Sequence, residues 1–244
     1  MDYSTSSFRW GSEHLGPSDP AWIELVSVVE SLNQIDILEE KLRKFQSWRQ
    51  GGNTPPVGGQ AILNSLIESK LKSLGWETQI YCLGRIKDET GKRSKRLAYW
   101  TLDFKKRDIG VEVSFNNAGV LAQNVLRLSV MSENPDRPKE ERIRLGILVC
   151  ANNDLKTWSG MDTTVLTFES VIKVIPLMNF NIPTPIVVLG LHSSSEGTIW
   201  EETDFFSHKK LKKWTELSDP ERREWSRKID AYETNVGLRQ GRET

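Results

Sequence analysis

Two strand-like segments joined by a short polar turn constrain this chain more than any other feature, and they lie between residues 97 and 117. The second segment alternates apolar and polar residues: Val111, Glu112, Val113, Ser114, Phe115 and Asn116. A period of two indicates a strand with one apolar face and one polar face. Residues 97–103 are rich in aromatic and apolar side chains and predict a preceding strand, with the turn region at 105–110.

This hairpin would bring two carboxylates together. Asp103 ends the first strand and can face Glu112 on the second. Paired carboxylates form small oxygen-ligand sites for Mg²⁺, and such sites often serve phosphodiester cleavage. The alternative is an amphipathic hairpin whose acids are only solvated.

The segment also carries a resemblance. Its residues from Asp103 to Asn117 fit the pattern Asp-Phe-x-Lys-Arg-Asp-x-x-Val-Glu-Val-x-Phe-x-Asn, which resembles the active-site segment of the BglII-like type II restriction endonucleases. The close match covers about this one segment. It implies the PD-(D/E)xK nuclease fold, an α/β core with a central mixed sheet flanked by helices, and a Mg²⁺-dependent homodimer that acts on double-stranded DNA.

The resemblance places Asp103 and Glu112 at metal-binding positions. Ser114 then stands where the general pattern has lysine. A serine hydroxyl supplies no positive charge and abstracts no proton at neutral pH, so the identity of the general base stays open. A metal-bound water positioned by Glu112, Ser114 and the DNA phosphate is the expected nucleophile.

Some nucleases of this fold bring a further acid from the helix before the hairpin, and Glu68 is the candidate here. The competing interpretation is a solvent-exposed helix residue. The basic run Lys105, Lys106 and Arg107 beside the hairpin could contact DNA phosphates.

Two short polar groups are candidates for reading bases. Asn116 and Asn117 directly follow the catalytic strand, and asparagine can make paired hydrogen bonds to adenine. Asp162, Thr163 and Thr164 resemble a second recognition position of the same family. Each group has an ordinary alternative, a turn for the first and a helix cap for the second.

The remaining pattern predicts a single α/β domain of 244 residues. Helical spacing covers residues 20–50, as one or two helices, and 60–74, 118–131 and 163–178. Strands are expected at 76–81, 145–150 and 185–191, the last two buried on both faces. The C-terminal extension, 197–244, holds aromatic residues that we expect to pack on the core or at a subunit interface, with stacking on DNA as the alternative: Trp200, Phe205, Phe206, Trp214 and Trp225.

Composition limits the class of protein. The 33 basic and 33 acidic residues cancel, which argues against a simple nucleic-acid binder, although basic residues gather between Arg85 and Arg107. Cys82 and Cys150 give no disulfide framework or zinc spacing, and no apolar run is long enough for a membrane span. We therefore expect a cytoplasmic protein with no membrane partner, from a bacterium or archaeon if the resemblance holds.

The leading hypothesis is a type II restriction endonuclease that hydrolyses both strands at a short palindrome, containing GATC as the best guess, and leaves 5′-phosphate ends. A two-fold dimer would explain palindromic specificity. A second hypothesis, which rests on Ser114, is a DNA-binding or DNA-repair protein that keeps the nuclease fold without hydrolysis. A third is a nuclease of low sequence specificity.

Overall fold

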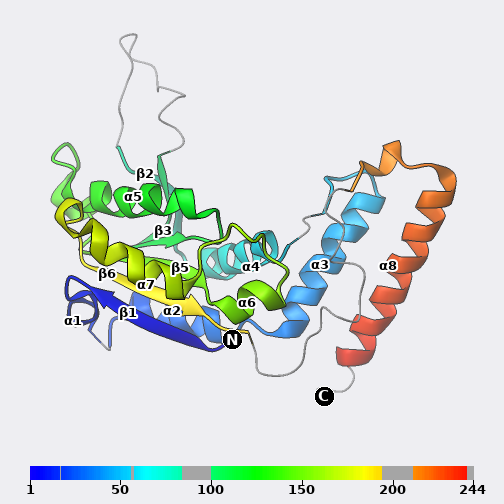
Figure 1. Cartoon of the computed structure of the whole chain (residues 1–244), viewed down its shortest axis with the longest axis horizontal. Coiled ribbons are helices and arrows are strands. Elements are labelled where there is room, and N and C mark those ends of the chain that lie inside the picture. Colours follow the sequence, from blue (N-terminus) through cyan, green and yellow to red (C-terminus); the bar gives the residue numbers. More distant parts are fainter. Residues whose placement is uncertain (17, 56–57, 84–99, 194–210, 241–244) are drawn as a thin grey trace, which may run out of the picture.

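A six-stranded mixed sheet forms the centre of the molecule (Figure 1). The computed structural model describes residues 1–244 except 17, 56–57, 84–99, 194–210 and 241–244. The strand order is β1-β6-β5-β4-β3-β2, with β4, β5 and β6 parallel and the other neighbours antiparallel. The strands are β1 Tyr3–Phe8, β2 Glu77–Tyr81, β3 Thr101–Lys106, β4 Ile109–Val113, β5 Leu145–Ala151 and β6 Ile186–Leu191. The predicted fold class, a mixed sheet flanked by helices, is confirmed.

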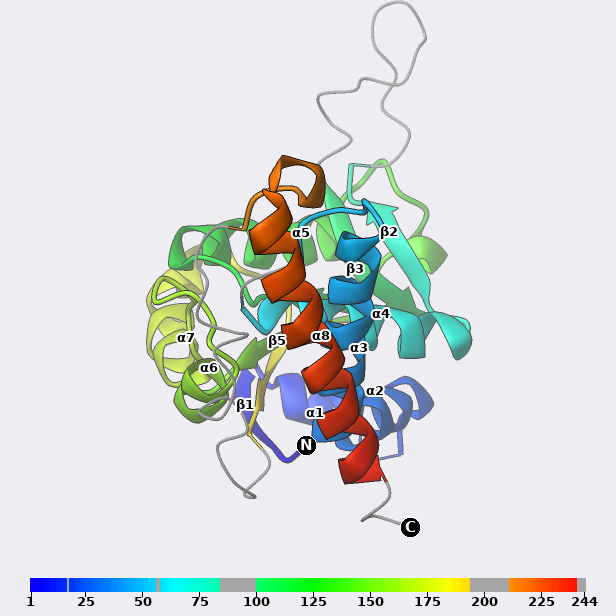
Figure 2. The same ribbon diagram turned by 90° about the vertical axis from the view of Figure 1, so that its right-hand side faces the viewer.

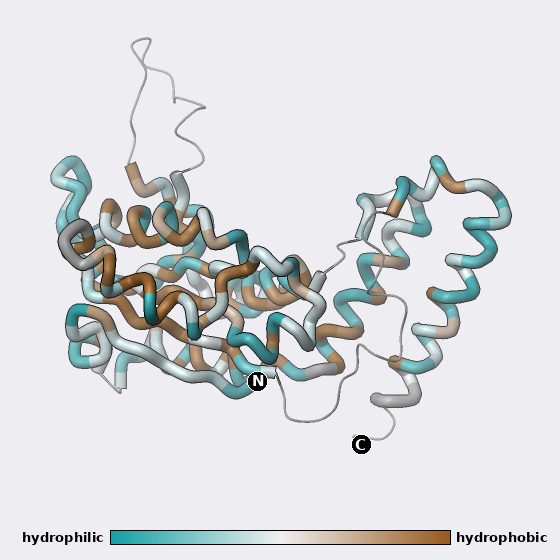
Figure 3. Tube along the Cα trace, in the orientation of Figure 1, coloured by the Kyte–Doolittle hydropathy of each residue, from teal (hydrophilic) through white to brown (hydrophobic). Residues whose placement is uncertain are grey.

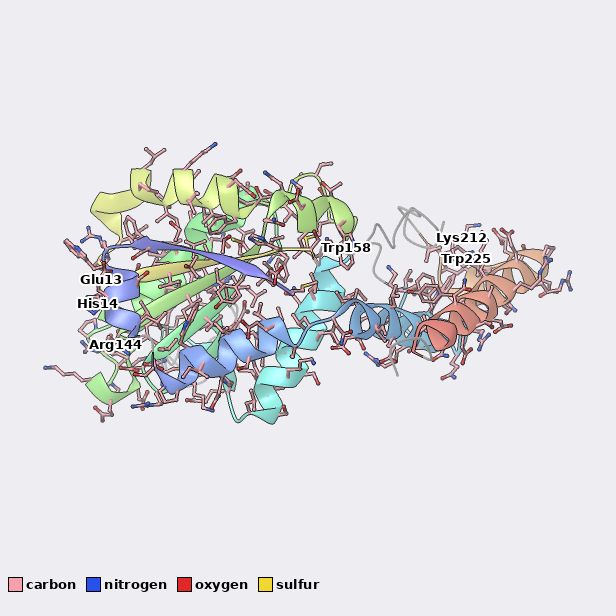
Figure 4. All side chains as sticks on the ribbon, turned by 90° about the horizontal axis from the view of Figure 1, so that it is seen from below. Glu13, His14, Arg144, Trp158, Lys212 and Trp225 are labelled. Atoms are coloured by element: carbon pink, nitrogen blue, oxygen red, sulfur yellow. The ribbon has the colours of Figure 1, made fainter. Side chains whose placement is uncertain are left out.

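Helices cover both faces of this sheet (Figures 1 and 4). Helices α5 and α7 lie on one face, and α2 and α4 lie on the other. The α-helices are α1 Gly11–Leu15, α2 Pro20–Glu30, α3 Gln34–Arg49, α4 Gln60–Ser73, α5 Leu121–Glu133, α6 Asn153–Trp158, α7 Phe168–Val174 and α8 Asp219–Gln240. Short 3-10 helices are η2 Ala118–Val120, η3 Lys139–Glu141, η4 Ile175–Asn181 and η6 Trp214–Glu216.

The sheet separates two apolar cores. Val111 and Ile147 belong to the core on the α2 and α4 side, whereas Leu148 belongs to the core under α5 and α7. Successive strand side chains point to opposite faces, so Glu112, the polar side chain of β4, faces α5. Strands β5 and β6 are buried along their whole length, as their continuous apolar runs predict. Strand β4 is also buried throughout, although its alternating pattern predicts one polar face.

Apolar residues gather along the central strands and the inner helix faces, and polar residues lie outside them (Figure 3). In the described part of the chain, no helix is both long and apolar enough to cross a membrane.

Helices α3 and α8 pack side by side at one end of the molecule (Figure 2). Their contact is aromatic: Trp48 meets Trp214 and Trp225 edge to face, with ring centroids 5.0 and 5.4 Å apart, and Phe45 stacks on Trp225 at 6.0 Å. Figure 4 shows Trp225 at the end of the molecule opposite Arg144. The expected packing role is confirmed for Trp214 and Trp225, while Trp200, Phe205 and Phe206 lie outside the described residues.

Several expected boundaries differ. The helix predicted from 163 begins only at Phe168, because the Asp162 carboxylate accepts hydrogen bonds from the Thr164 amide and hydroxyl at 2.8 Å and holds a turn there. The strand β3 extends through Lys105 and Lys106, so the expected turn shrinks to Arg107 and Asp108. Residues 20–50 do form two helices, α2 and α3.

Candidate active site

The hairpin of β3 and β4 places the two predicted carboxylates opposite each other. Its last paired residues are Phe104 and Val111, so Asp103 and Glu112 are the next to face one another. There the strands stop exchanging backbone hydrogen bonds, and the Val113 amide donates instead to Asp103 Oδ2, at 2.9 Å. The Asp103 carboxylate thereby accepts a hydrogen bond that a backbone carbonyl of the neighbouring strand would otherwise accept. This hydrogen bond from the Val113 amide holds the Asp103 side chain in place.

Glu112 is buried beneath α5, with 1% of its surface exposed. Arg127 Nη1 donates to Glu112 Oε2 at 3.2 Å and to Asn124 Oδ1 at 3.1 Å. Burial and the neighbouring Asp103 charge raise the pKa of Glu112 to about 9, although Arg127 opposes this. Without a bound cation, the Glu112 carboxyl therefore retains its proton at neutral pH.

Burial also raises the pKa of Asp103, and the charge of Glu68 adds to this effect. Hydrogen bonds from Val113 and Gln79 and the charge of Arg127 act in the opposite direction. Gln79 has a left-handed backbone, with φ of 54°, and its side chain also accepts a hydrogen bond from Thr101 at 3.0 Å. Such backbone strain is often concentrated at functional sites.

The buried carboxyl group of Glu112 has the chemistry of a cation ligand. Glu112 Oε1 is buried and has no hydrogen-bond partner among the described residues. A buried, unpaired carboxylate oxygen is costly, and a hard cation such as Mg²⁺ is the ligand that would satisfy it. The oxygen donors of Glu112 and Asp103 therefore fit a hard cation such as Mg²⁺, which these two side chains would hold.

Glu68 is not drawn into this pair. It lies on α4, half-exposed, and its carboxylate accepts from Lys72 at 2.5 Å. Within the described ranges, no group of three or more His, Cys, Asp or Glu side chains is placed to hold a metal. The role of Glu68 as a metal ligand stays a prediction. Ser114 is buried directly after β4, and its amide donates to Val149 O at 2.7 Å.

The two predicted base-reading groups lie side by side. The amide of Ala118 donates to Thr164 O at 3.1 Å, and Leu166 N donates to Asn116 O at 3.3 Å. Asn117 also forms an isolated bridge with Val165. All five predicted side chains are exposed: Asn116, Asn117, Asp162, Thr163 and Thr164. The fold thus joins two segments 46 residues apart, counted from 116 to 162, into one polar surface at the end of β4.

The basic run lies at the opposite end of β4. Lys105 is buried, 3.7 Å from Glu77, and Lys106 Nζ donates to Glu24 at 2.6 Å and to Leu74 O at 2.8 Å. Arg107 is exposed in the turn. Residues 85–96 of the wider basic stretch lie outside the described residues.

Three site residues were not predicted: Gln79, Asn124 and Arg127. Asn124 and Arg127 are separated by one helical turn and lie on the same helix face. The sequence signal was available, because this pair adjoins the apolar positions Leu121 and Leu128 that turn α5 toward the sheet. Polar residues beside such a stripe indicate a polar partner on the sheet.

The sequence of residues 3–191 matches the model of the family described as restriction endonuclease BglII/BglIII. That match covers more than half of the chain. The chain belongs to this family. Its members are restriction endonucleases, which hydrolyse DNA and typically depend on metal, and the predicted resemblance is confirmed.

A solved structure of BglII with DNA agrees on the fold. The crystal structure of restriction endonuclease BglII complexed with a DNA 16-mer matches with a TM-score of 0.55 and 19% sequence identity, over 81% of this chain and 79% of that one. Free BglII matches with a TM-score of 0.49 and 18% identity, over 81% and 82%. A search of curated protein sequences found no match. Helix α8 lies beyond the segment that matches the family.

Proposed function

We propose that this BglII/BglIII-family enzyme is a type II restriction endonuclease in which Asp103 and Glu112 bind Mg²⁺. The observation that carries the proposal is the buried Glu112 carboxylate with an unpaired oxygen opposite Asp103. Bound Mg²⁺ would lower the pKa of a coordinated water and offset charge on the phosphate. Attack of that water on phosphorus would form a new P–O bond as the P–O3′ bond breaks, and the 3′ oxygen would take up a proton, leaving a 5′-phosphate and a 3′-hydroxyl.

The protein's own groups prepare this reaction. Val113 and Gln79 fix the Asp103 carboxylate, and α5 shields Glu112 from bulk water. A dry, fixed pair of carboxylates strengthens electrostatic interactions with the reacting phosphate. Ser114 has no basic group, so no side chain at that position removes a proton from water.

The surface formed by Asn116–Asn117 and Asp162–Thr164 would read bases. Its amide, carboxylate and hydroxyl groups offer both donors and acceptors to base edges. One subunit supplies one such surface beside one pair of carboxylates. A two-fold homodimer would therefore read two half-sites and cut both strands of a palindrome, for which a sequence containing GATC is our candidate.

Digestion of unmodified phage or plasmid DNA of known sequence tests this function. The purified protein is incubated in Mg²⁺ or in EDTA, and the fragment ends are sequenced. We expect discrete fragments only in Mg²⁺, with a shared palindrome and 5′-phosphates at their ends. Smeared products would contradict sequence specificity, and intact DNA in both conditions would support the non-hydrolytic alternative.

A further inference from the structure

Ser114 stands where the general nuclease pattern has a lysine, so position 114 supplies no positive side chain to the active site. Ser114 has no charge, and Lys105 and Lys106 on β3 are engaged with Glu77 and Glu24. Among the described residues, the two carboxylates nevertheless share a basic neighbour. Arg127 is the cation whose charge lowers the pKa of both Asp103 and Glu112.

Arg127 reaches the site from α5, across from the strand that would carry the lysine. Its Nη1 atom is held by Asn124 Oδ1 and Glu112 Oε2, at 3.1 and 3.2 Å. Asn124 is itself buried, with 1% of its surface exposed. An arginine fixed by a buried amide and a buried carboxylate has little freedom left, so its charge is preorganised.

The guanidinium also retains unused donors. Nε and Nη2 make no hydrogen bond within the described part of the chain, and one fifth of the side chain is exposed. The Nδ2 atom of Asn124 is buried and lacks a partner there as well. These N–H groups gather beside the carboxylates. A phosphate oxygen is a fitting acceptor for them, because arginine binds phosphate in a fork geometry.

We infer that Arg127 supplies the positive charge of the active site in place of a lysine at position 114. It balances Glu112 through Nη1 and donates from Nε and Nη2 to a non-bridging oxygen of the DNA phosphate during hydrolysis. Asn124 positions it. This inference rests on the proposed function and adds to it the residue that stabilises the phosphate charge.

The test compares Arg127→Met with Arg127→Lys, and with Arg49→Met as a matched control at the α3–α8 contact. Single-turnover cleavage in Mg²⁺ is measured together with Mn²⁺ affinity without DNA. We expect Arg127→Met to lose about 10²- to 10³-fold in rate, the loss typical of removing one charge-stabilising donor. Its Mn²⁺ affinity should hold or rise, because a cation that competes for Glu112 is gone. Arg127→Lys should cleave faster than Arg127→Met, and Arg49→Met should cleave like the wild type.

A second variant guards against a folding defect. In the Arg127→Met background, Ser114→Lys should recover at least about tenfold in rate, because a positive charge returns from position 114, directly after β4. Cleavage by Arg127→Met within threefold of wild type would overturn the inference. So would equal losses of rate and Mn²⁺ affinity, which would mean that Arg127 only holds Glu112 in place. An inactive wild-type enzyme would instead overturn the proposed function, and the inference with it.

Discussion

Two buried regions of this molecule show opposite chemistry. Between β4 and α5 lie a carboxylate, an amide and a guanidinium, and two of their atoms, Glu112 Oε1 and Asn124 Nδ2, have no hydrogen-bond partner among the described residues. Between α3 and α8 lie aromatic rings, and the Trp48 indole donates to Lys212 O at 3.1 Å. The first region carries charge that burial penalises, and the second buries apolar surface.

This difference separates stability from activity. Aromatic packing stabilises the folded state and needs no ligand. A buried carboxylate with an elevated pKa destabilises the metal-free protein at neutral pH, and metal binding relieves that cost. We therefore expect substitutions in the two regions to have separable effects.

The largest expected effect is on activity. Asp103→Asn should lower the cleavage rate by at least about 10³-fold, because asparagine is a weaker ligand for Mg²⁺. The bound metal is expected to stabilise the charged transition state by several kcal/mol. Asparagine retains an oxygen that can accept from Val113 N. Specific DNA binding, measured by gel shift in Ca²⁺, should therefore persist. Full cleavage by this variant would contradict the assignment of the site.

Trp225→Ala should have the largest effect on stability. The ring is buried between Phe45 and Trp48, so its removal should cost about 3–5 kcal/mol. Urea denaturation measures the loss. Cleavage at low temperature should stay near that of wild type. A large fall in the rate of the folded variant would show that the two regions are coupled.

Metal affinity should depend on pH. The pKa of Glu112 is raised to about 9, so a cation must displace its proton at any lower pH. Mn²⁺ affinity should rise by up to about tenfold per pH unit from 6 to 8. Calorimetric titrations in two buffers of different ionisation enthalpy would detect the released proton. A Mn²⁺ affinity that does not change with pH would contradict the expectation that Glu112 is protonated in the metal-free protein.

We expect the smallest effect from breaking an exposed ion pair, Arg49–Asp230, in contrast to the buried pair of Arg127 and Glu112. Arg49 Nη1 contacts Asp230 Oδ1 at 2.6 Å and joins α3 to α8, but both side chains are substantially exposed, at 32% and 62%. Arg49→Met should change the free energy of unfolding by less than about 1 kcal/mol, because solvent screens such pairs. Thermal denaturation measures this value. A larger loss would mean that the aromatic contact depends on this pair.

The local pattern predicted much of the fold and the facing positions of Asp103 and Glu112 on β3 and β4. Alternation around Glu112 fixed its strand and its polar face, and Gly75 marked the end of α4, where it adopts a φ of 78°. The strand β1, with sequence YSTSSF, has an aromatic residue only at each end and a polar run between them, and it gains its structure from pairing with β6.

The rest depended on tertiary contacts. Asn124 and Arg127 were recognisable as polar residues of a helix, but only the packing of α5 on the sheet brings Arg127 to Glu112. Likewise, the turn at Asp162 overrides the helical spacing that follows it. Contacts between residues far apart in the chain determine where Arg127 lies and where α7 begins. Local periodicity does not predict such contacts.

Glu112→Gln tests the central claim most directly, because glutamine keeps the shape of the side chain and removes its charge. Since the folded pKa of Glu112 is about 9 and its ordinary value is 4.5, the stability that its proton supports is complete below pH 4.5 and is lost as the pH rises toward 9. In EDTA, we predict that the variant is more stable than wild type at pH 8, by on the order of 4 kcal/mol, and nearly equal at pH 4.5. In Mg²⁺ it should not cleave DNA. The claim is that buried Glu112 destabilises the metal-free protein and binds the metal needed for hydrolysis. A variant that is less stable than wild type at pH 8, or that cleaves at the wild-type rate, would contradict it.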